Sequence, residues 1–197
     1  MEHKHHAKSS IKFFETDDIL KQLGFAGNET FMDAGCGDGH IAVRALEEFI
    51  PDGKAYAVDV YSPCIENLKD YAEKNNIDNL IAIEADVGER IPGVEDGSVD
   101  VILMVNVVHG FKASENMGQV IGEMSKLLKV GGKFAIVDFN PIEWSVGPPI
   151  EIKCSPIELE EIFTKFNFKL TYLNEEMGPD EDGKRSHYII IFEKEQM

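Results

Sequence analysis

The stretch Phe31-Met32-Asp33-Ala34-Gly35-Cys36-Gly37-Asp38-Gly39 decides how the rest of the chain is interpreted. It begins as a short apolar strand, passes an acidic residue at the end of that strand, and turns through three alternating glycines into a predicted helix. Glycine is needed where a backbone bends sharply or lets a ligand approach without a Cβ in the way. The first strand-to-helix crevice of an open sheet is also where such folds bind ligands. This stretch therefore predicts a ligand-binding loop rather than an ordinary turn.

Short β-branched runs alternate with helical stretches around this loop, which is typical of an α/β domain built on a largely parallel sheet. We predict strands over residues 30–34, 54–60, 80–84, 99–105 and 133–139. Helices are predicted over 16–23, 39–49, 62–75, 113–128 and 156–166. The unbroken apolar character of 99–105 indicates a central strand that is covered on both faces. Two strand-like runs, 168–174 and 187–193, are joined by a polar loop over 175–186 and predict an antiparallel hairpin at one edge.

Local signals place several of the predicted helix ends. Ser62 and Ser155 are each followed by proline, so both are expected to be helix N-caps. The pair Gly131-Gly132 is expected to end the helix that precedes the fifth strand. The irregular connection over about 140–154 is long enough to be expected to carry function.

The length of 197 residues fits one domain, and we predict an N-terminal arm with the first helix over 1–28 and a ligand-binding domain over 29–197. The chain has 19 Lys and Arg against 36 Asp and Glu, a net charge of −17. So acidic a surface repels phosphate backbones and anionic lipid headgroups, which argues against a nucleic-acid partner. The expected partner is a small molecule, and a second copy of the chain could complete the site.

Cysteine usage and hydropathy predict a cytoplasmic protein. Cys36, Cys64 and Cys154 are too few and too scattered for a disulfide framework, so structural thiols are expected. No apolar run reaches the roughly 18 residues that a membrane helix needs. His3, His5 and His6 could bind a transition metal, as could Cys154 in the irregular connection over about 140–154. A mobile N-terminal arm explains the three histidines more simply, and a structural role explains the cysteine more simply. We therefore assign no metal site.

The glycine spacing separates two classes of cofactor. A dinucleotide fingerprint has G-x-G-x-x-G, whereas Gly35, Gly37 and Gly39 form G-x-G-x-G after Asp33. On these residues the chain resembles the class I S-adenosylmethionine-dependent methyltransferases from Phe31 to Phe192. The resemblance implies a doubly wound seven-stranded sheet with an antiparallel edge hairpin and S-adenosyl-L-methionine as the cofactor. The loop residues expected to contact the cofactor are Asp33, Gly35, Cys36, Gly37 and Gly39.

Later landmarks extend the resemblance. Asp59 closes the second strand, where a carboxylate can accept both ribose hydroxyls, although an acid there also fits NAD. In similar methyltransferases the acid at Asp86 receives the adenine amino group and the next backbone N–H, that of Val87, meets the ring. Val60, beside Asp59, is also expected to contact the cofactor. Asn106, at the end of the fourth strand, is expected to contact the cofactor near its sulfonium.

The segment Leu127-Leu128-Lys129-Val130-Gly131-Gly132 is similar to the L-K-P-G-G stretch of this superfamily, with valine in place of proline. The closest pattern within the superfamily is that of the small quinone-biosynthesis-type C-methyltransferases. It rests on the motif spacing, on the His after strand four and on Gly147-Pro148-Pro149. The N-methyltransferase signature is absent because Val107 and Val108 follow Asn106.

Methyl transfer from a sulfonium is a direct displacement, so the protein aligns donor and acceptor and needs no nucleophile of its own. A base to deprotonate the acceptor is the remaining requirement, and His109 is the first candidate because its ordinary pKa lies near neutrality. Asp138 is the second. The alternatives are that His109 only packs over the cofactor and that Asp138 only pins a loop or helix.

We expect methyl transfer to a small, apolar or aromatic acceptor. Phe139 and Trp144, with Phe13 and Phe14 of the arm, could roof its pocket. The alternative from another class is a non-catalytic protein of the same fold that binds the cofactor or a partner. An NAD-dependent oxidoreductase is third, opposed by the glycine spacing and the edge hairpin.

Overall fold

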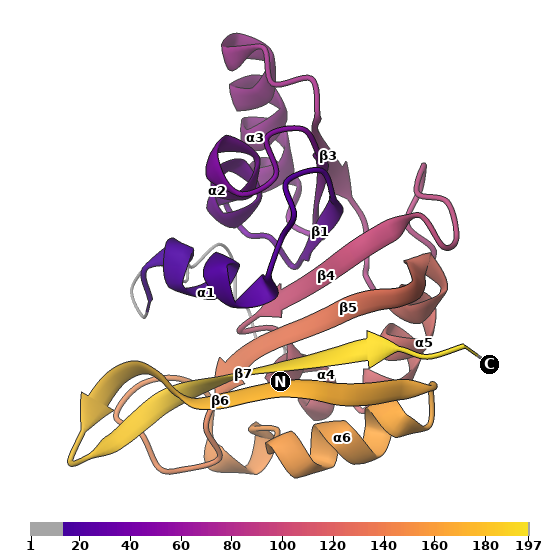
Figure 1. Ribbon diagram of the computed structural model, residues 1–197. Coiled ribbons are helices and arrows are strands. Elements are labelled where there is room, and N and C mark those ends of the chain that lie inside the picture. The colour runs from indigo at the N-terminus through magenta and orange to yellow at the C-terminus, as the bar shows by residue number, and fades with distance from the viewer. Residues whose placement is uncertain (1–13, 197) are drawn as a thin grey trace.

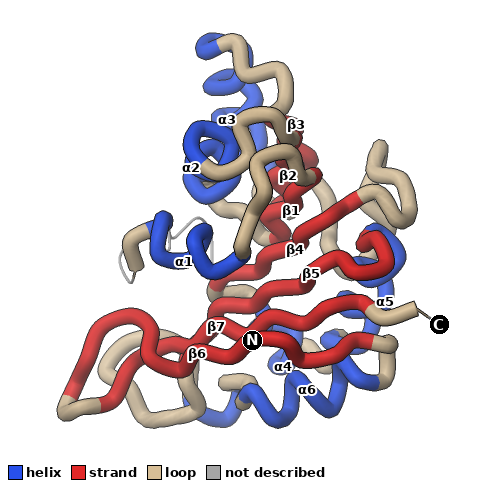
Figure 2. Tube along the Cα trace, in the orientation of Figure 1, coloured by secondary structure: helices blue, strands red, loops and turns tan. Residues whose placement is uncertain are grey.

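A seven-stranded sheet with helices on both faces forms the centre of the protein in the computed structural model, which describes residues 14–196 (Figure 1, Figure 2). The strands are β1 (Thr30–Ala34), β2 (Lys54–Asp59), β3 (Leu80–Glu84), β4 (Val99–Val105), β5 (Leu128–Phe139), β6 (Phe168–Glu181) and β7 (Lys184–Lys194). The helices are α1 (Thr16–Leu23), α2 (His40–Glu48), α3 (Ser62–Asn75), α4 (Val108–Ala113), α5 (Met117–Leu127), the short 3-10 turn η2 (Ile150–Ile152) and α6 (Pro156–Thr164).

The strand order β3-β2-β1-β4-β5-β7-β6 confirms the predicted fold class. Strands β1 to β5 pair in parallel, and β7 is antiparallel to both β5 and β6. The strand order reverses direction between β1 and β4. In open α/β sheets, ligands bind at such a reversal point, outside the carboxyl ends of the two strands that flank it. The carboxyl ends of β1, β4 and β5 are thereby brought to one edge.

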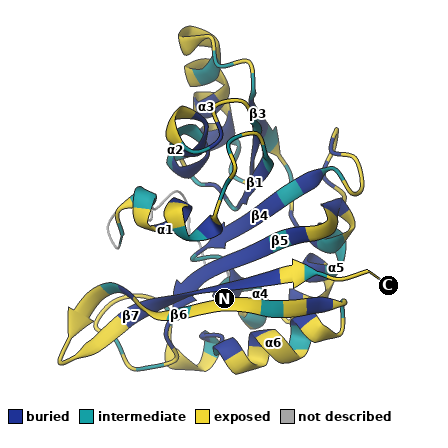
Figure 3. Cartoon of the chain, viewed as in Figure 1, coloured by how far each residue is buried: buried dark blue, intermediate teal, exposed yellow. Residues whose placement is uncertain are grey.

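Two hydrophobic clusters cover the two faces of the sheet. Alternation along β1 directs Phe31 to the cluster made with α1, α2 and α3, and Met32 to the cluster made with α5 and α6. Figure 3 shows β4, β5 and most of β7 buried, while β6 at the edge is largely exposed. The prediction of a central strand over 99–105 is confirmed, because β4 lies between β1 and β5.

The helix predicted over about 113–128 is present as α5, but it begins later than predicted, at Met117. The short α4, which the sequence did not predict, precedes it, and Glu115 between the two helices has a φ of 57°. This left-handed conformation is one that a helix cannot continue through. Helix α5 ends at Leu127, before the Gly131-Gly132 pair, which lies inside β5. Gly110 lowers the helix propensity of the short α4, so the sequence pattern did not predict this helix.

The two predicted serine caps have different outcomes. Ser155 forms a reciprocal capping box with Glu158, as expected. Ser62, in contrast, is the first residue of α3, and Tyr61 is the N-cap with no side-chain cap bond. The Ser62 hydroxyl instead donates to Glu84 Oε2 at 2.8 Å, so it links α3 to the end of β3.

The edge hairpin is confirmed, but its predicted loop is wrong. Strands β6 and β7 continue through most of residues 175–186 and meet at Asp182 and Gly183, both with positive φ, as a two-residue hairpin turn requires. Pairing of β7 with β5 ends at His187 opposite Phe139. The far end of the hairpin therefore extends past the sheet (Figure 1), where its residues are polar because no core covers them.

Helix α1 is fastened to α2 by a bidentate ion pair, in which Arg44 donates to both carboxylate oxygens of Asp17 at 2.7 and 2.9 Å. The boundary predicted at residue 28 stays a prediction. Within residues 14–196, none of the helices has both the length and the apolar character that crossing a membrane requires.

Candidate functional site

The glycine loop between β1 and α2 is tied to the end of β2. The backbone N–H groups of Gly35 and Cys36 both donate to Val58 O, at 2.8 and 3.0 Å. The N–H of Gly37 donates to Asp59 Oδ2 at 2.9 Å. The loop is thus held by fixed hydrogen bonds before any ligand arrives.

All three loop glycines have positive φ, which favours glycine at each position. A Cβ at Gly35 would lie 2.7 Å from a methyl of Val107, and one at Gly39 would collide with Leu68. A Cβ at Gly37 would meet nothing within 4 Å. Packing therefore explains the absence of a side chain at Gly35 and Gly39, whereas the space in front of Gly37 is open for a ligand.

Asp33, at the end of β1, is 1% exposed, and its Oδ2 has no hydrogen-bond partner among the described residues. Burial raises the pKa of this carboxyl to about 7; repulsion from Asp59 and Asp38 adds to the increase, and His40 opposes it. A buried acid with an unsatisfied oxygen costs free energy in the folded protein. A cationic ligand group beside it would remove that cost.

Asp59 and Asp86 lie where the sequence placed them, at or just after the ends of β2 and β3. Asp59 accepts from Gly37 N and Tyr61 N, one bond to each oxygen, and Asp86 Oδ1 accepts from Gly88 N at 2.8 Å. A carboxylate has about four acceptor sites, so both acids can still accept ligand hydroxyl or amino groups.

The two valines beside these acids differ. Val60 is exposed, while the side chain of Val87 is buried in the core. Val87 can therefore offer a ligand only its backbone, whereas Val60 also has an accessible side chain.

Asn106 directly follows β4 and has a φ of 56°, and its Oδ1 is buried without a hydrogen-bond partner in the described part of the chain. A non-glycine residue in this region stores conformational strain, and such residues gather at functional sites. Asp33 and Asn106 therefore present two unsatisfied buried oxygens on neighbouring strands. Such a pair, beside an open glycine loop and two accepting carboxylates, fits a cofactor that has a cationic amino-acid end, a ribose and an adenine.

His109 and Asp138 meet at the ends of α4 and β5. His109 Nδ1 lies 2.9 Å from Asp138 Oδ1, and both side chains are buried. An ionised carboxylate only accepts, so this contact assigns the proton to Nδ1 and leaves the basic lone pair on Nε2. The arrangement is a histidine oriented by a carboxylate, which is suited to proton transfer.

Asp138 also has a structural role. Its carboxylate accepts from the backbone N–H of His109 at 3.2 Å and from that of Phe139 at 2.7 Å. It therefore pins the first turn of α4 to β5, as the alternative interpretation anticipated. One carboxylate fixes both the position of the His109 backbone and the orientation of its ring.

Phe139 is the centre of a second group of polar side chains. Its ring lies 4.0 Å from the His187 ring and 6.0 Å from the His109 ring, and Lys153 Nζ is 5.5 Å from its centroid. Phe14 packs on His187 edge-on at 4.6 Å. Phe14 and Phe139, two of the aromatic residues predicted to cover the acceptor pocket, therefore both contact the His187 ring. Phe13 lies outside the described residues.

Sequence reasoning missed His187 and Lys153. His187 lies inside β7, and burial lowers its pKa to about 4. Lys153 lies in an irregular segment, where a lysine is usually solvent-exposed. Neither residue belongs to a motif, so no local signal in the sequence could have identified them.

The cysteines act as structural residues. Cys36, Cys64 and Cys154 are all buried, and burial raises the pKa of each thiol, that of Cys154 to about 12. Protonated thiols are poor nucleophiles and poor metal ligands. Over residues 14–196, no group of three or more His, Cys, Asp or Glu side chains could hold a metal ion. His3, His5 and His6 lie outside the described residues.

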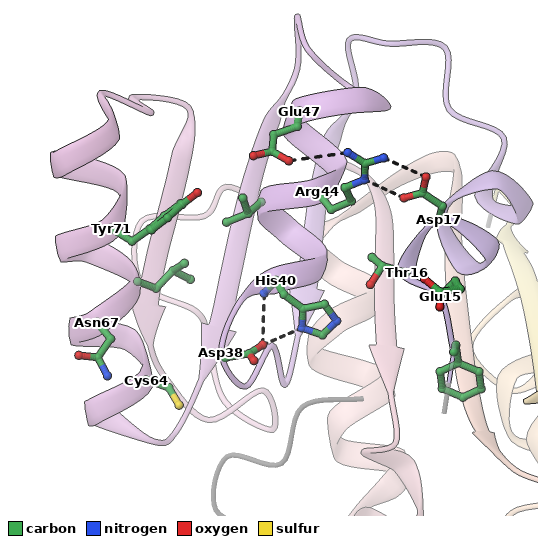
Figure 4. A pocket seen from close by; sticks show the side chains of 13 residues that line it. Glu15, Thr16, Asp17, Asp38, His40, Arg44, Glu47, Cys64, Asn67 and Tyr71 are labelled. Carbon is green, nitrogen blue, oxygen red and sulfur yellow. Dashed lines mark hydrogen bonds and ion pairs between the residues drawn. The ribbon is translucent and has the colours of Figure 1, made fainter. Parts of the chain in front are cut away.

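A cavity of about 810 Å³ lies between α1, α2 and α3, beside the glycine loop (Figure 4). Figure 4 shows Tyr71 on α3 at one side and Asp17, bound to Arg44, at the other. Asp38 is the loop residue that reaches it, and the three carboxylates Asp33, Asp59 and Asp86 do not line it. This cavity is therefore a groove next to the predicted cofactor site and not that site itself.

Comparison with known proteins begins with a family described as "Methyltransferase domain", whose model matches residues 26–193. A 2-phytyl-1,4-naphtoquinone methyltransferase of Nostoc punctiforme is 31% identical over 116 residues, which cover 58% of this chain and 48% of the relative. An uncharacterized RNA methyltransferase of Clostridium acetobutylicum is 32% identical over 108 residues, covering 50% of this chain and 23% of the relative.

A solved structure of a SAM-dependent methyltransferase from Aquifex aeolicus superimposes with a TM-score of 0.77 at 22% identity, covering 94% of this chain and 93% of that one. At this identity the match establishes the fold. The chain spans 40% to 48% of the length of the first curated relatives that it matches.

Proposed function

Because the chain belongs to the methyltransferase-domain family, we propose that it transfers the methyl group of S-adenosylmethionine to a small, apolar or aromatic acceptor. The family confirms the resemblance that the glycine loop indicated, and with it the class of enzyme and of cofactor. The absence of a nucleic-acid partner, a cytoplasmic location and the oligomeric state stay predictions.

One observation carries the proposal: the unsatisfied oxygens of Asp33 and Asn106 lie at the same sheet edge as the His109–Asp138 pair. Asp33 would accept from the amino group of the cofactor, Asp59 from its ribose hydroxyls and Asp86 from its adenine. Gly35, Gly37 and Gly39, with Cys36, would form the cradle, and Asn106 would lie beside the sulfonium. The backbones of Val60 and Val87 would complete the adenosyl contacts.

The bound cofactor supplies an electrophilic methyl group, so the chain's own task is alignment and proton removal. His109 Nε2 would take the acceptor's proton and so prepare it for attack on the methyl group. Asp138 would keep Nδ1 protonated and stabilise the imidazolium that results, as a positioning residue. The buried aromatic cluster around Phe139 would exclude water from this side.

Calorimetric titration with S-adenosylhomocysteine, and separately with NAD, tests the cofactor assignment. We expect S-adenosylhomocysteine to bind and NAD not to bind. Asp59→Ala should weaken binding by about 1 to 3 kcal/mol, because ribose hydroxyls lose their acceptor. Asp70→Ala, which removes an exposed aspartate from α3, is the matched control and should bind as the wild type does.

Two outcomes of this titration would change the conclusion. Unaltered affinity in Asp59→Ala would contradict the assignment of the ribose site, and binding of NAD alone would favour the oxidoreductase alternative. The non-catalytic alternative predicts the same cofactor binding but no release of S-adenosylhomocysteine with any of the quinols, phenols and thiols offered as acceptors.

A further inference from the structure

Lys153 is a lysine buried next to the predicted acceptor site. It follows η2 and is 2% exposed. Lys112 of α4 donates to its backbone oxygen at 2.8 Å, which fixes this part of the chain against α4. Its ammonium Nζ donates to Ile142 O at 2.6 Å and lies 5.5 Å from the centroid of the Phe139 ring.

This ammonium lacks partners for most of its hydrogen-bonding capacity. The ammonium has three N–H donors. Among residues 14–196, the only acceptor that it reaches is the carbonyl oxygen of Ile142. No carboxylate oxygen of the described residues lies within 4.0 Å of Lys153 Nζ, the limit for an ion pair. Burial lowers the Lys153 pKa, and the more distant charges of Glu143 and Asp138 oppose this only in part. A buried charge without an anionic partner is costly.

The surroundings of Lys153 connect it to the His109–Asp138 pair. The Phe139 ring contacts both, since Lys153 Nζ lies near its centroid and the His109 ring lies 6.0 Å away. Asp138 already accepts from two backbone N–H groups and from His109, so it is committed elsewhere. His187 lies on the same ring and adds no negative charge. Among the described residues, this side of the site therefore has a base and a cation, but no carboxylate is paired with the cation.

We propose that Lys153 binds the oxyanion of an acidic acceptor, a phenol or an enol, after His109 has removed its proton. The inference rests on the proposed function and narrows its substrate class from apolar or aromatic acceptors to those with an ionisable oxygen in conjugation.

The chemistry balances with the cofactor as the only co-reactant. The acceptor O–H bond breaks, its proton goes to His109 Nε2, and its electron pair is shared between the oxygen and the conjugated carbon. That pair forms the bond to the methyl carbon, while the pair of the carbon–sulfur bond stays on sulfur. If carbon receives the methyl group, its proton then leaves and the oxygen regains one. One proton is released to water overall in either case.

A purely structural Lys153 is the competing explanation. In that case its hydrogen bond to Ile142 O only ties the connection after β5 to the start of α6. Removing the side chain would then lower stability without altering any preference between ionised and neutral ligands. The two explanations therefore differ in a binding measurement that requires no turnover.

4-Nitrophenol and its methyl ether, 4-nitroanisole, are suitable probes because only the phenol ionises, and its phenolate is followed by absorbance. Both are titrated into the full chain with S-adenosylhomocysteine at saturation. In the wild type we expect the phenolate to bind better than the ether and the pKa of the bound phenol to fall by about one unit or more. Lys153→Met should abolish this shift and weaken phenolate binding about tenfold.

Two further variants control this experiment. Lys153→Arg keeps the charge and should retain the phenolate preference, and Lys169→Met, which removes an exposed lysine from β6, should behave as the wild type. Thermal unfolding of each variant shows whether it is folded. If Lys153→Met fails to fold, the wild-type preference and the Lys153→Arg result still decide the matter.

The inference is overturned if the wild type binds neither probe, prefers the ether, or binds both equally, and also if folded Lys153→Met keeps the shift. Binding of S-adenosylhomocysteine is measured first in every sample. A chain that binds it without favouring the phenolate contradicts the role of Lys153 alone, whereas a chain that does not bind it contradicts the proposed function.

Discussion

The ends of β1 and β5 each carry a buried aspartate, and the two differ in how they are satisfied. Asp138 accepts from two backbone N–H groups and from His109. Asp33 is just as buried, yet one of its oxygens has no hydrogen-bond partner in the described structure, and its pKa is raised to about 7. The carboxylate of Asp138 is satisfied by groups of the folded chain, whereas that of Asp33 keeps one oxygen that the described residues do not satisfy.

The same contrast applies to charge. Among residues 14–196, the Asp33 carboxyl of the proposed cofactor site has no cationic partner, and Lys153 of the proposed acceptor site has no anionic partner. A cationic methyl donor and an anionic acceptor would satisfy both deficits at once. Both deficits lie at the edge where β1, β4 and β5 end, so the charges of the two substrates would be matched before the methyl group moves.

Replacing Asp138 should have the largest effect. Asp138→Asn keeps the shape of the side chain but no longer holds His109 in the basic tautomer, so turnover should fall about 100-fold or more. The measurement is the rate of S-adenosylhomocysteine release with an acceptor that the wild type methylates. Affinity for S-adenosylhomocysteine should be unchanged.

His109→Gln sharpens this test. It should lose about as much activity, because no base remains to take the acceptor's proton. The double variant should be no slower than either single one, since the two residues act as a unit. Additive losses would mean that Asp138 acts only as a structural pin.

Asp33 should make stability depend on pH. Its pKa is 3.8 in the unfolded reference and about 7 in the folded protein. Between these values the folded state retains a proton that the unfolded state has lost, so its contribution to the free energy of unfolding falls as pH rises from about 4 to about 7. Asp33→Asn should remove that decrease and be about 1 to 3 kcal/mol more stable than the wild type at pH 8.

Denaturant unfolding at several pH values measures this difference, and near pH 4 the two chains should have equal stability. His187 has the opposite dependence, since its lowered pKa costs stability as pH falls from 6.5 to about 4. This contribution is the same in the wild type and in Asp33→Asn, so it drops out of the difference between their stabilities. Asp70→Asn is the control for an exposed aspartate. Parallel curves for the wild type and Asp33→Asn would contradict the raised pKa.

The smallest expected effect concerns the loop glycine with open space in front of it. Gly37→Ala and Gly93→Ala each place a Cβ at positive φ where no atom lies within 4 Å. Both should therefore cost a similar stability of about 1 kcal/mol. Only Gly37→Ala should also weaken binding of S-adenosylhomocysteine. Equal affinities in the two variants would show that the ligand does not approach Gly37.

Much of the cofactor side could be predicted because its residues are adjacent in sequence. Gly35, Gly37 and Gly39 occupy one turn, and the structure gives each the positive φ that the pattern implies. Asp59 and Asp86 could be located because each follows a recognisable strand. The alternation of strands and helices likewise predicted a largely parallel sheet, because parallel strands need helical crossovers.

The predictions failed where local patterns compete. The break between α4 and α5 depends on the left-handed Glu115, a residue type that helices ordinarily favour. The long edge hairpin depends on backbone hydrogen bonds between β6 and β7. The polar side chains of residues 175–186 neither indicate nor prevent these bonds.

The sequence by itself determined the glycine loop, the acids at the strand ends and, through them, the family, since these features depend on short-range spacing. It also singled out His109 and Asp138 as separate candidates. Only the tertiary structure decided that these two bind each other across 29 positions, that Asp33 and Asn106 retain unsatisfied oxygens, and that Lys153 is buried beside Phe139. The physical reason is that desolvation and hydrogen-bond satisfaction depend on which distant segments the fold packs together, and no local pattern encodes that.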